Sequence, residues 1–106
     1  MSHTKSKFTP GQVRATKALL RFCQEHGHAP FWIEQLKECV GALEAKKDAV
    51  VCEKYALLRR AGMGSFIDWF PRTPEGEDGQ YEETLWWALD AYWLEVMQPF
   101  KNAGNA

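Results

Sequence analysis

The sequence predicts an all-α fold, a small four-helix bundle-like domain with a long irregular loop before the last helix. Apolar residues recur at helical spacing along most of the 106 residues, and Pro, Gly or Asp stands where helices should begin or end. Aromatic residues make up 13% of the chain and five of them are tryptophans, so the core should be aromatic-rich. A strand is conceivable only over a short stretch between Gly64 and Pro71.

One domain is expected, because a chain of this length has no room for a second core. We assign residues 1–8 to a flexible N-terminal tail, 9–100 to a single helical domain and 101–106 to a C-terminal tail. The N-terminus lacks the apolar segment of a signal peptide, and no stretch reads as a membrane span. The number of cysteines is odd, which is not typical of a disulfide framework. Together with the missing signal peptide, this number predicts a cytoplasmic protein with reduced thiols.

The first helix has the clearest start signal. The segment from Thr9 to Gln12 combines an N-cap threonine, a proline at the first helical position and a glutamine that completes a capping box. This helix should run to about His26, with Gly27 as its left-handed cap.

Two further helices should follow. Pro30 opens the second helix. Gly41 weakens this helix by up to about 1 kcal/mol, so the helix can end early. Asp48 is expected to cap the third helix, whose last turn holds Arg59 and Arg60.

The longest irregular stretch covers residues 64–80. Within it, Ser65 and Asp68 are expected to form a capping pair around one short turn. The last helix should start at Asp78 or Gly79, and Pro99 should stop it.

The last helix is expected to carry the main core face. On a wheel of about 100° per residue, its large apolar side chains fall within an arc of about 160°. They are Tyr81, Leu85, Trp86, Leu89, Tyr92, Trp93, Val96, Met97 and Phe100. Trp87 and Leu94 lie outside this arc. They form either an exposed apolar pair among acids or a site that the tail or the loop covers.

Charge is unevenly distributed along the chain. Residues 1–60 hold 11 Lys/Arg and 6 Asp/Glu, whereas residues 61–106 hold 2 Lys/Arg and 8 Asp/Glu. The two halves can neutralise each other in the fold, or the acidic half can steer a basic partner.

Signals for catalysis or metal binding are weak. Cys23, His26 and His28 are close in sequence, but the chain has no C-x-x-C pair and no H-E-x-x-H motif. Ser65 does not stand in a nucleophile elbow, and the clustered carboxylates look solvated. We therefore expect no enzyme, and we assign no catalytic residue, cofactor or metal.

A helix-turn-helix DNA-binding regulator is the alternative function. The second and third helices would supply the motif, with basic contacts from Lys46, Lys47, Lys54, Arg59 and Arg60. Proteins that bind phosphate backbones usually carry excess positive charge, whereas this chain has a net charge of −1, so nucleic acid is the less favoured partner.

The segment from Ala61 to Trp69 resembles the signature of small bacterial domains with a Gly-Met-Gly-Ser-Phe-x-Asp core. Those domains are also about 100 residues long, and an aromatic-rich helix follows their motif. Some resemble immunity proteins, the cytosolic inhibitors of interbacterial toxins. The resemblance implies a structural role for Ser65 and Asp68, and it implies no catalytic residue.

The resulting hypothesis is a cytosolic inhibitor that neutralises a basic protein, such as a toxin or nuclease domain, by direct binding. Aromatic anchors would supply affinity and acids would supply rate and orientation. The expected contact residues are Asp68, Glu75, Glu77, Asp78, Glu82, Glu83, Trp87 and Asp90. No membrane partner is expected, and a homodimer through Trp87 and Leu94 stays open.

Overall fold

The computed structural model describes residues 7–60, 64–69 and 77–101 and is all-α within these ranges. Four α-helices follow in order: α1 (Pro10–His26), α2 (Pro30–Glu44), α3 (Asp48–Arg59) and α4 (Glu77–Val96). A short 3₁₀ turn, Gln98–Phe100, follows α4. No residue in the described ranges is in a strand, so the predicted helical fold class is confirmed.

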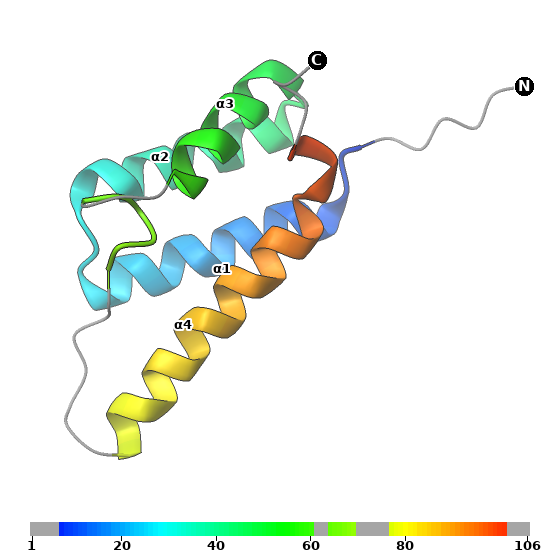
Figure 1. Ribbon diagram of the computed structural model, residues 1–106. Helices are drawn as coiled ribbons and strands as arrows, with labels where there is room; N and C mark the ends of the chain where they lie inside the picture. The colour runs from blue at the N-terminus through cyan, green and yellow to red at the C-terminus, as the bar shows by residue number, and fades with distance from the viewer. Residues whose placement is uncertain (1–6, 61–63, 70–76, 102–106) are drawn as a thin grey trace, which may run out of the picture.

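Helix α1 lies at the centre of the arrangement. It packs against α2 and against α4, and α3 packs on α2. Figure 1 shows α2 and α3 on one side of the blue α1, with the yellow and orange α4 running along its other side. Among the described helices, α1 is the one that runs along α4, and α3 reaches α4 through Tyr55 and Arg59. No described helix packs along the other long side of α4.

The predicted ends of α1 are confirmed. The Gln12 side-chain oxygen accepts a hydrogen bond from the backbone N–H of Thr9 at 2.9 Å. The same amide donates to the carbonyls of Lys7 and Val96, so it ties the start of α1 to the end of α4. Gly27 has the expected left-handed conformation with φ 76°, which glycine adopts without a steric penalty.

Other boundaries differ from the sequence-based expectation. Helix α2 continues through Gly41 to Glu44, because packing against α1 and α3 outweighs the weak propensity of one glycine. Lys47, not Asp48, is the N-cap of α3, and the Asp48 carboxylate instead pairs with Lys7 at 2.9 Å. Residues 64–69 form a turn rather than an extended segment.

Two residues assigned to the N-terminal tail, Lys7 and Phe8, contact the helical part of the chain, whereas residues 1–6 lie outside the described part. Lys7 contacts Asp48, and the ring of Phe8 lies edge-on to Phe100 with centroids 5.4 Å apart. These two residues therefore belong to the packed part of the chain.

The core face of α4 is narrower than predicted. Trp86, Trp93 and Met97 are fully buried, whereas Tyr81 and Tyr92 of the predicted core arc are exposed. Leu85, from the same arc, is also exposed. The physical reason is that α1 is the only described helix that runs along α4, with side chains of α3 and of residues 64–69 reaching the same face, so these neighbours cover a narrower stripe than the predicted arc.

Trp93 provides the polar link between α4 and α1. Its indole N–H donates to the Thr16 hydroxyl at 2.9 Å, and that hydroxyl donates to the Gln12 carbonyl at 2.7 Å. All three side chains are buried, so water cannot replace these bonds.

Replacing Thr16 with valine should therefore leave the buried Trp93 indole N–H without a hydrogen-bond acceptor. We expect Thr16→Val to lower the free energy of unfolding by about 2 kcal/mol, the cost of a buried donor without an acceptor. Thr16→Ser keeps the hydroxyl and should cost less. Urea unfolding of the three chains measures both changes, and equal stability of Thr16→Val and wild type would contradict the role of this bond.

Candidate functional site

The structure describes only part of the predicted contact surface. Glu75 lies outside the described residues. Glu77 and Asp78 are the first two residues of α4, and their side chains also lie outside the described part. Five predicted contact residues have described side chains, and they do not form one surface. They are Asp68, Glu82, Glu83, Trp87 and Asp90.

Asp68 holds a turn. Its carboxylate accepts a hydrogen bond from the Gly64 backbone N–H at 3.0 Å, and its own N–H donates to the Ser65 carbonyl. Gly64 has φ 79°, a conformation that side chains rarely adopt. The carboxylate is therefore engaged in keeping residues 64–68 folded back on themselves.

Glu82 joins α4 to the end of α1. Its carboxylate lies 3.0 Å from His26 Nε2, and His26 Nδ1 lies 2.9 Å from the Phe22 carbonyl. Both ring nitrogens thus face oxygen acceptors, so both contacts are hydrogen bonds only when the imidazole carries two protons. The His26–Glu82 contact joins the last residue of α1 to the N-terminal part of α4.

Asp90 is not on the surface, and its prediction as an exposed contact residue is wrong. Its side chain is buried and pairs with Arg59 of α3 at 2.7 Å. Burial raises the pKa of Asp90, and the nearby Arg59 guanidinium opposes that rise. The helical wheel could not show this, because the residue that covers Asp90 comes from a different helix.

Glu83 and Trp87 are exposed, as the prediction requires. Trp87 is 42% exposed, and its ring lies 6.2 Å from that of the buried Trp86. Glu83 and Trp87 lie one helical turn apart on α4, so a carboxylate and an indole lie side by side at the surface. Leu94, the suggested companion of Trp87, packs partly against the core instead.

A second exposed row on α4 was missed by the sequence analysis. Tyr81 is 69% exposed, Leu85 37% and Tyr92 46%, and Ala88 between them is exposed too. We call these four residues the α4 seam. Their spacing of four, three and four residues places them in one line along the helix. That spacing was visible in the sequence, but the predicted core arc was so wide that it included Tyr81, Leu85 and Tyr92.

The aromatic cluster around His28, which packs on the buried Trp86, is structural. The His28 ring stacks on Trp69 with centroids 4.2 Å apart and on Phe66 at 5.0 Å. Its Nδ1 accepts from the Ala29 N–H at 2.7 Å, so Nε2 must carry the proton that reaches the Phe66 carbonyl. His28 is thereby held as one neutral tautomer, and its burial lowers its pKa.

Candidate catalytic and metal-binding groups are not assembled in the described ranges. No group of three or more His, Cys, Asp or Glu side chains is arranged to hold a metal ion there. Burial raises the pKa of both Cys23 and Cys39 to about 12, so these thiols stay protonated at neutral pH. The Ser65 hydroxyl and the Trp86 indole N–H are buried without a hydrogen-bond partner in the described structure.

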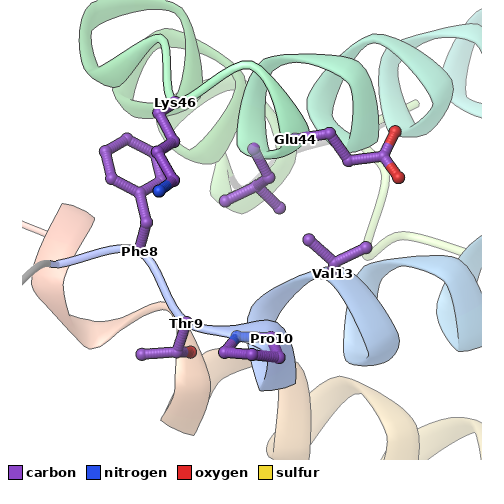
Figure 2. Close-up of a pocket in the computed structure, with 7 residues that line it drawn as sticks. Phe8, Thr9, Pro10, Val13, Glu44 and Lys46 are labelled. Carbon is purple, nitrogen blue, oxygen red and sulfur yellow. The ribbon is translucent and has the colours of Figure 1, made fainter.

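A pocket of about 260 Å³ lies between the start of α1 and the end of α2. Figure 2 shows Phe8 beside Lys46 at one end and Glu44 at the other. The Glu44 carboxylate lies 3.4 Å from Lys17 Nζ. Sites that enclose drug-sized ligands are usually larger, from about 300 Å³ upwards. None of the predicted contact residues lines this pocket.

Comparisons with protein-family models, with curated proteins and with solved structures gave no match to this chain. None of the described helices is both long enough and apolar enough to cross a lipid bilayer.

The Arg59–Asp90 pair generates a stability prediction. Arg59→Met should leave a buried carboxylate unpaired and lower the free energy of unfolding by about 3 kcal/mol. The double variant Arg59→Met, Asp90→Leu removes both charges and should recover most of that loss. Chemical unfolding of both variants tests this, and a double variant less stable than the single one would refute it.

His28 generates a pH prediction. Because its pKa is lowered in the folded state, the unfolded chain takes up a proton first as the pH falls through about 6.5. Stability should therefore be highest above this value and decline below it. The variant His28→Phe keeps the stacking but cannot titrate, so its melting temperature should change less between pH 7.5 and pH 5.5 than that of wild type. Equal pH dependence of the two chains would contradict the assignment.

Proposed function

We propose that this protein acts by binding a basic protein partner, which it neutralises by covering it, as an immunity protein does. The observation that supports the proposal is the side of α4 along which no described helix packs, where exposed aromatic and acidic side chains lie together. Tyr81, Trp87 and Tyr92 are exposed there, and Glu83 and Glu95 are exposed on the same helix. Exposed aromatic residues are the usual anchors of protein interfaces.

The charge of α4 favours a basic partner. The helix contains six acidic residues and no Lys or Arg, and the sequence has none between Arg72 and Lys101. Two of these acids have partners within the fold: the Glu82 carboxylate lies 3.0 Å from His26 Nε2, and Asp90 forms an ion pair with Arg59. Glu83 and Glu95 form no ion pair with any residue that the structure describes, so their charge remains available for steering.

The same contacts weigh against the DNA-binding alternative. Lys54 is buried and donates to Gln35 and Glu38, and Arg59 is held by Asp90. Two of the five basic residues that would contact phosphates are thus already occupied. Lys46, Lys47 and Arg60 remain exposed, which is fewer than such an interface usually uses.

Charge reversal on α4 tests the proposed function. The double variant Glu83→Lys, Glu95→Lys should weaken binding of the protein encoded by the adjacent gene by about tenfold or more, mainly through slower association. The control is Glu34→Lys, Glu53→Lys, which makes the same change in net charge on exposed positions of α2 and α3. Surface plasmon resonance measures both, and equal loss in the two variants would show a net-charge effect and reject the α4 surface.

A further inference from the structure

His28 connects the junction of α1 and α2 to the turn formed by residues 64–69. Its Nε2–H donates to the Phe66 carbonyl at 3.0 Å. Figure 1 shows the 64–69 turn, in light green, beside this junction. A second hydrogen bond from the helices to the turn runs from Trp32 Nε1–H to the Gly64 carbonyl at 3.2 Å. One histidine and one tryptophan therefore carry the polar contacts that hold the described part of this turn against α2.

Aromatic rings enclose the imidazole of His28. It stacks on Trp69 with centroids 4.2 Å apart and on Phe66 at 5.0 Å, and the ring of Trp86 lies edge-on at 6.3 Å. Trp86 is fully buried on α4 and also lies edge-on to Trp69 at 4.9 Å. A displacement of the imidazole thus disturbs the packing of the 64–69 turn on α4 as well as its bond to α2.

The hydrogen bonds of His28 fit the neutral imidazole alone. The Ala29 N–H donates to Nδ1 at 2.7 Å, so Nδ1 must offer a lone pair. A proton on Nδ1 would set two N–H donors against each other and would place a positive charge in a buried site. Ala29 is the N-cap of α2, so its N–H is held in place by the chain. The imidazole is therefore the group that moves, and water is where its charge is solvated.

No carboxylate among the described residues forms an ion pair with His28. Burial is the main cause that lowers the pKa of this histidine, and the hydrogen bond to Phe66 opposes it only in part. Attraction between an imidazolium and the stacked Trp69 ring acts in the same direction as that bond. Charged side chains on the surrounding elements have other partners. These are Arg21 with Glu25, His26 with Glu82, Glu34 with Lys37, and Asp68 with the Gly64 N–H.

We propose that protonation of His28 releases the 64–69 turn from α2 and α4 while the α1–α4 contact around Trp93 stays closed. The turn is thus a pH-sensitive element that opens under mildly acidic conditions. The surface that it uncovers is aromatic, because Phe66 and Trp86 are fully buried in the closed form. This inference is independent of the proposed function, since it involves neither Glu83 nor Glu95.

Two indole N–H groups of the full chain measure the opening. The Trp32 indole bonds to Gly64 in the turn, whereas the Trp93 indole bonds to Thr16 between α1 and α4. Hydrogen exchange of both protons is followed by NMR at pH 7.5 and at pH 5.5. The ratio of the Trp32 rate to the Trp93 rate is the readout, because the intrinsic effect of pH on indole exchange is common to both and cancels.

We expect this ratio to rise at least about threefold on acidification. A histidine with the ordinary pKa of about 6.5 in the open form permits a rise of at most about tenfold over this interval. A rise below threefold would overturn the proposal. Equal acceleration of the two protons gives no rise in the ratio and would show that the whole fold opens instead.

Histidine-to-glutamine variants identify the side chain that is responsible. His28→Gln keeps an amide N–H that can donate to Phe66 but takes up no proton, so the rise should be lost. His26→Gln removes the histidine two residues away, which contacts Glu82, and should keep the rise. A rise of threefold or more in His28→Gln, or its loss in His26→Gln, would assign the response to another group and reject the proposal.

Discussion

Two tryptophans of α4 fix how that helix is rotated on α1, and the position of every other α4 side chain depends on this. Trp86 and Trp93 are completely buried. Trp86 stacks on Phe22 of α1 with ring centroids 5.7 Å apart, and Trp93 donates its indole proton to Thr16. A hydrogen bond and a stacked ring pair are both directional, so together they leave little freedom to turn the helix. Rotation by one residue would bury Trp87 and expose Trp86.

This rotation separates the acids of α4 into two groups with different roles. Asp90 points between the helices and meets Arg59, and Glu82 points to the end of α1 and meets His26. Glu83 and Glu95 are exposed. Some acids in the negative half of the chain therefore hold helices together, and others are exposed at the surface. Internal neutralisation holds for Asp90, whereas Glu83 and Glu95 are the acids on which the proposed steering of a basic partner depends.

The sequence predicted local features well because local chemistry determines them. The start of α1 at Thr9 and the cap at Gly27 depend on residues within one helical turn, and both are confirmed. The core face of α4 was predicted less well, because its width depends on how many helices pack against it. A helical wheel contains no information about neighbours, so Tyr81 and Tyr92 were assigned to a core that does not reach them.

The candidate site shows the same division. The exposure of Glu83 and Trp87 followed from their position on the wheel, but the burial of Asp90 required knowing where Arg59 lies in space. The two residues are 31 positions apart and on different helices. Long-range pairs of this kind decide which charges are available to a partner, and a single sequence does not reveal them.

The three cysteines differ in a way that makes the native chain easy to label. Cys23 and Cys39 are buried and stay protonated, so alkylating reagents reach them only when the fold opens. Cys52 is partly exposed on α3, on a different helix from the α4 seam. Burial and the hydrogen bond to Asp48 also raise the pKa of Cys52, so a maleimide dye should attach to this one accessible position, more slowly than to a free cysteine. The dye would report on α3 while leaving the exposed side of α4 unmodified.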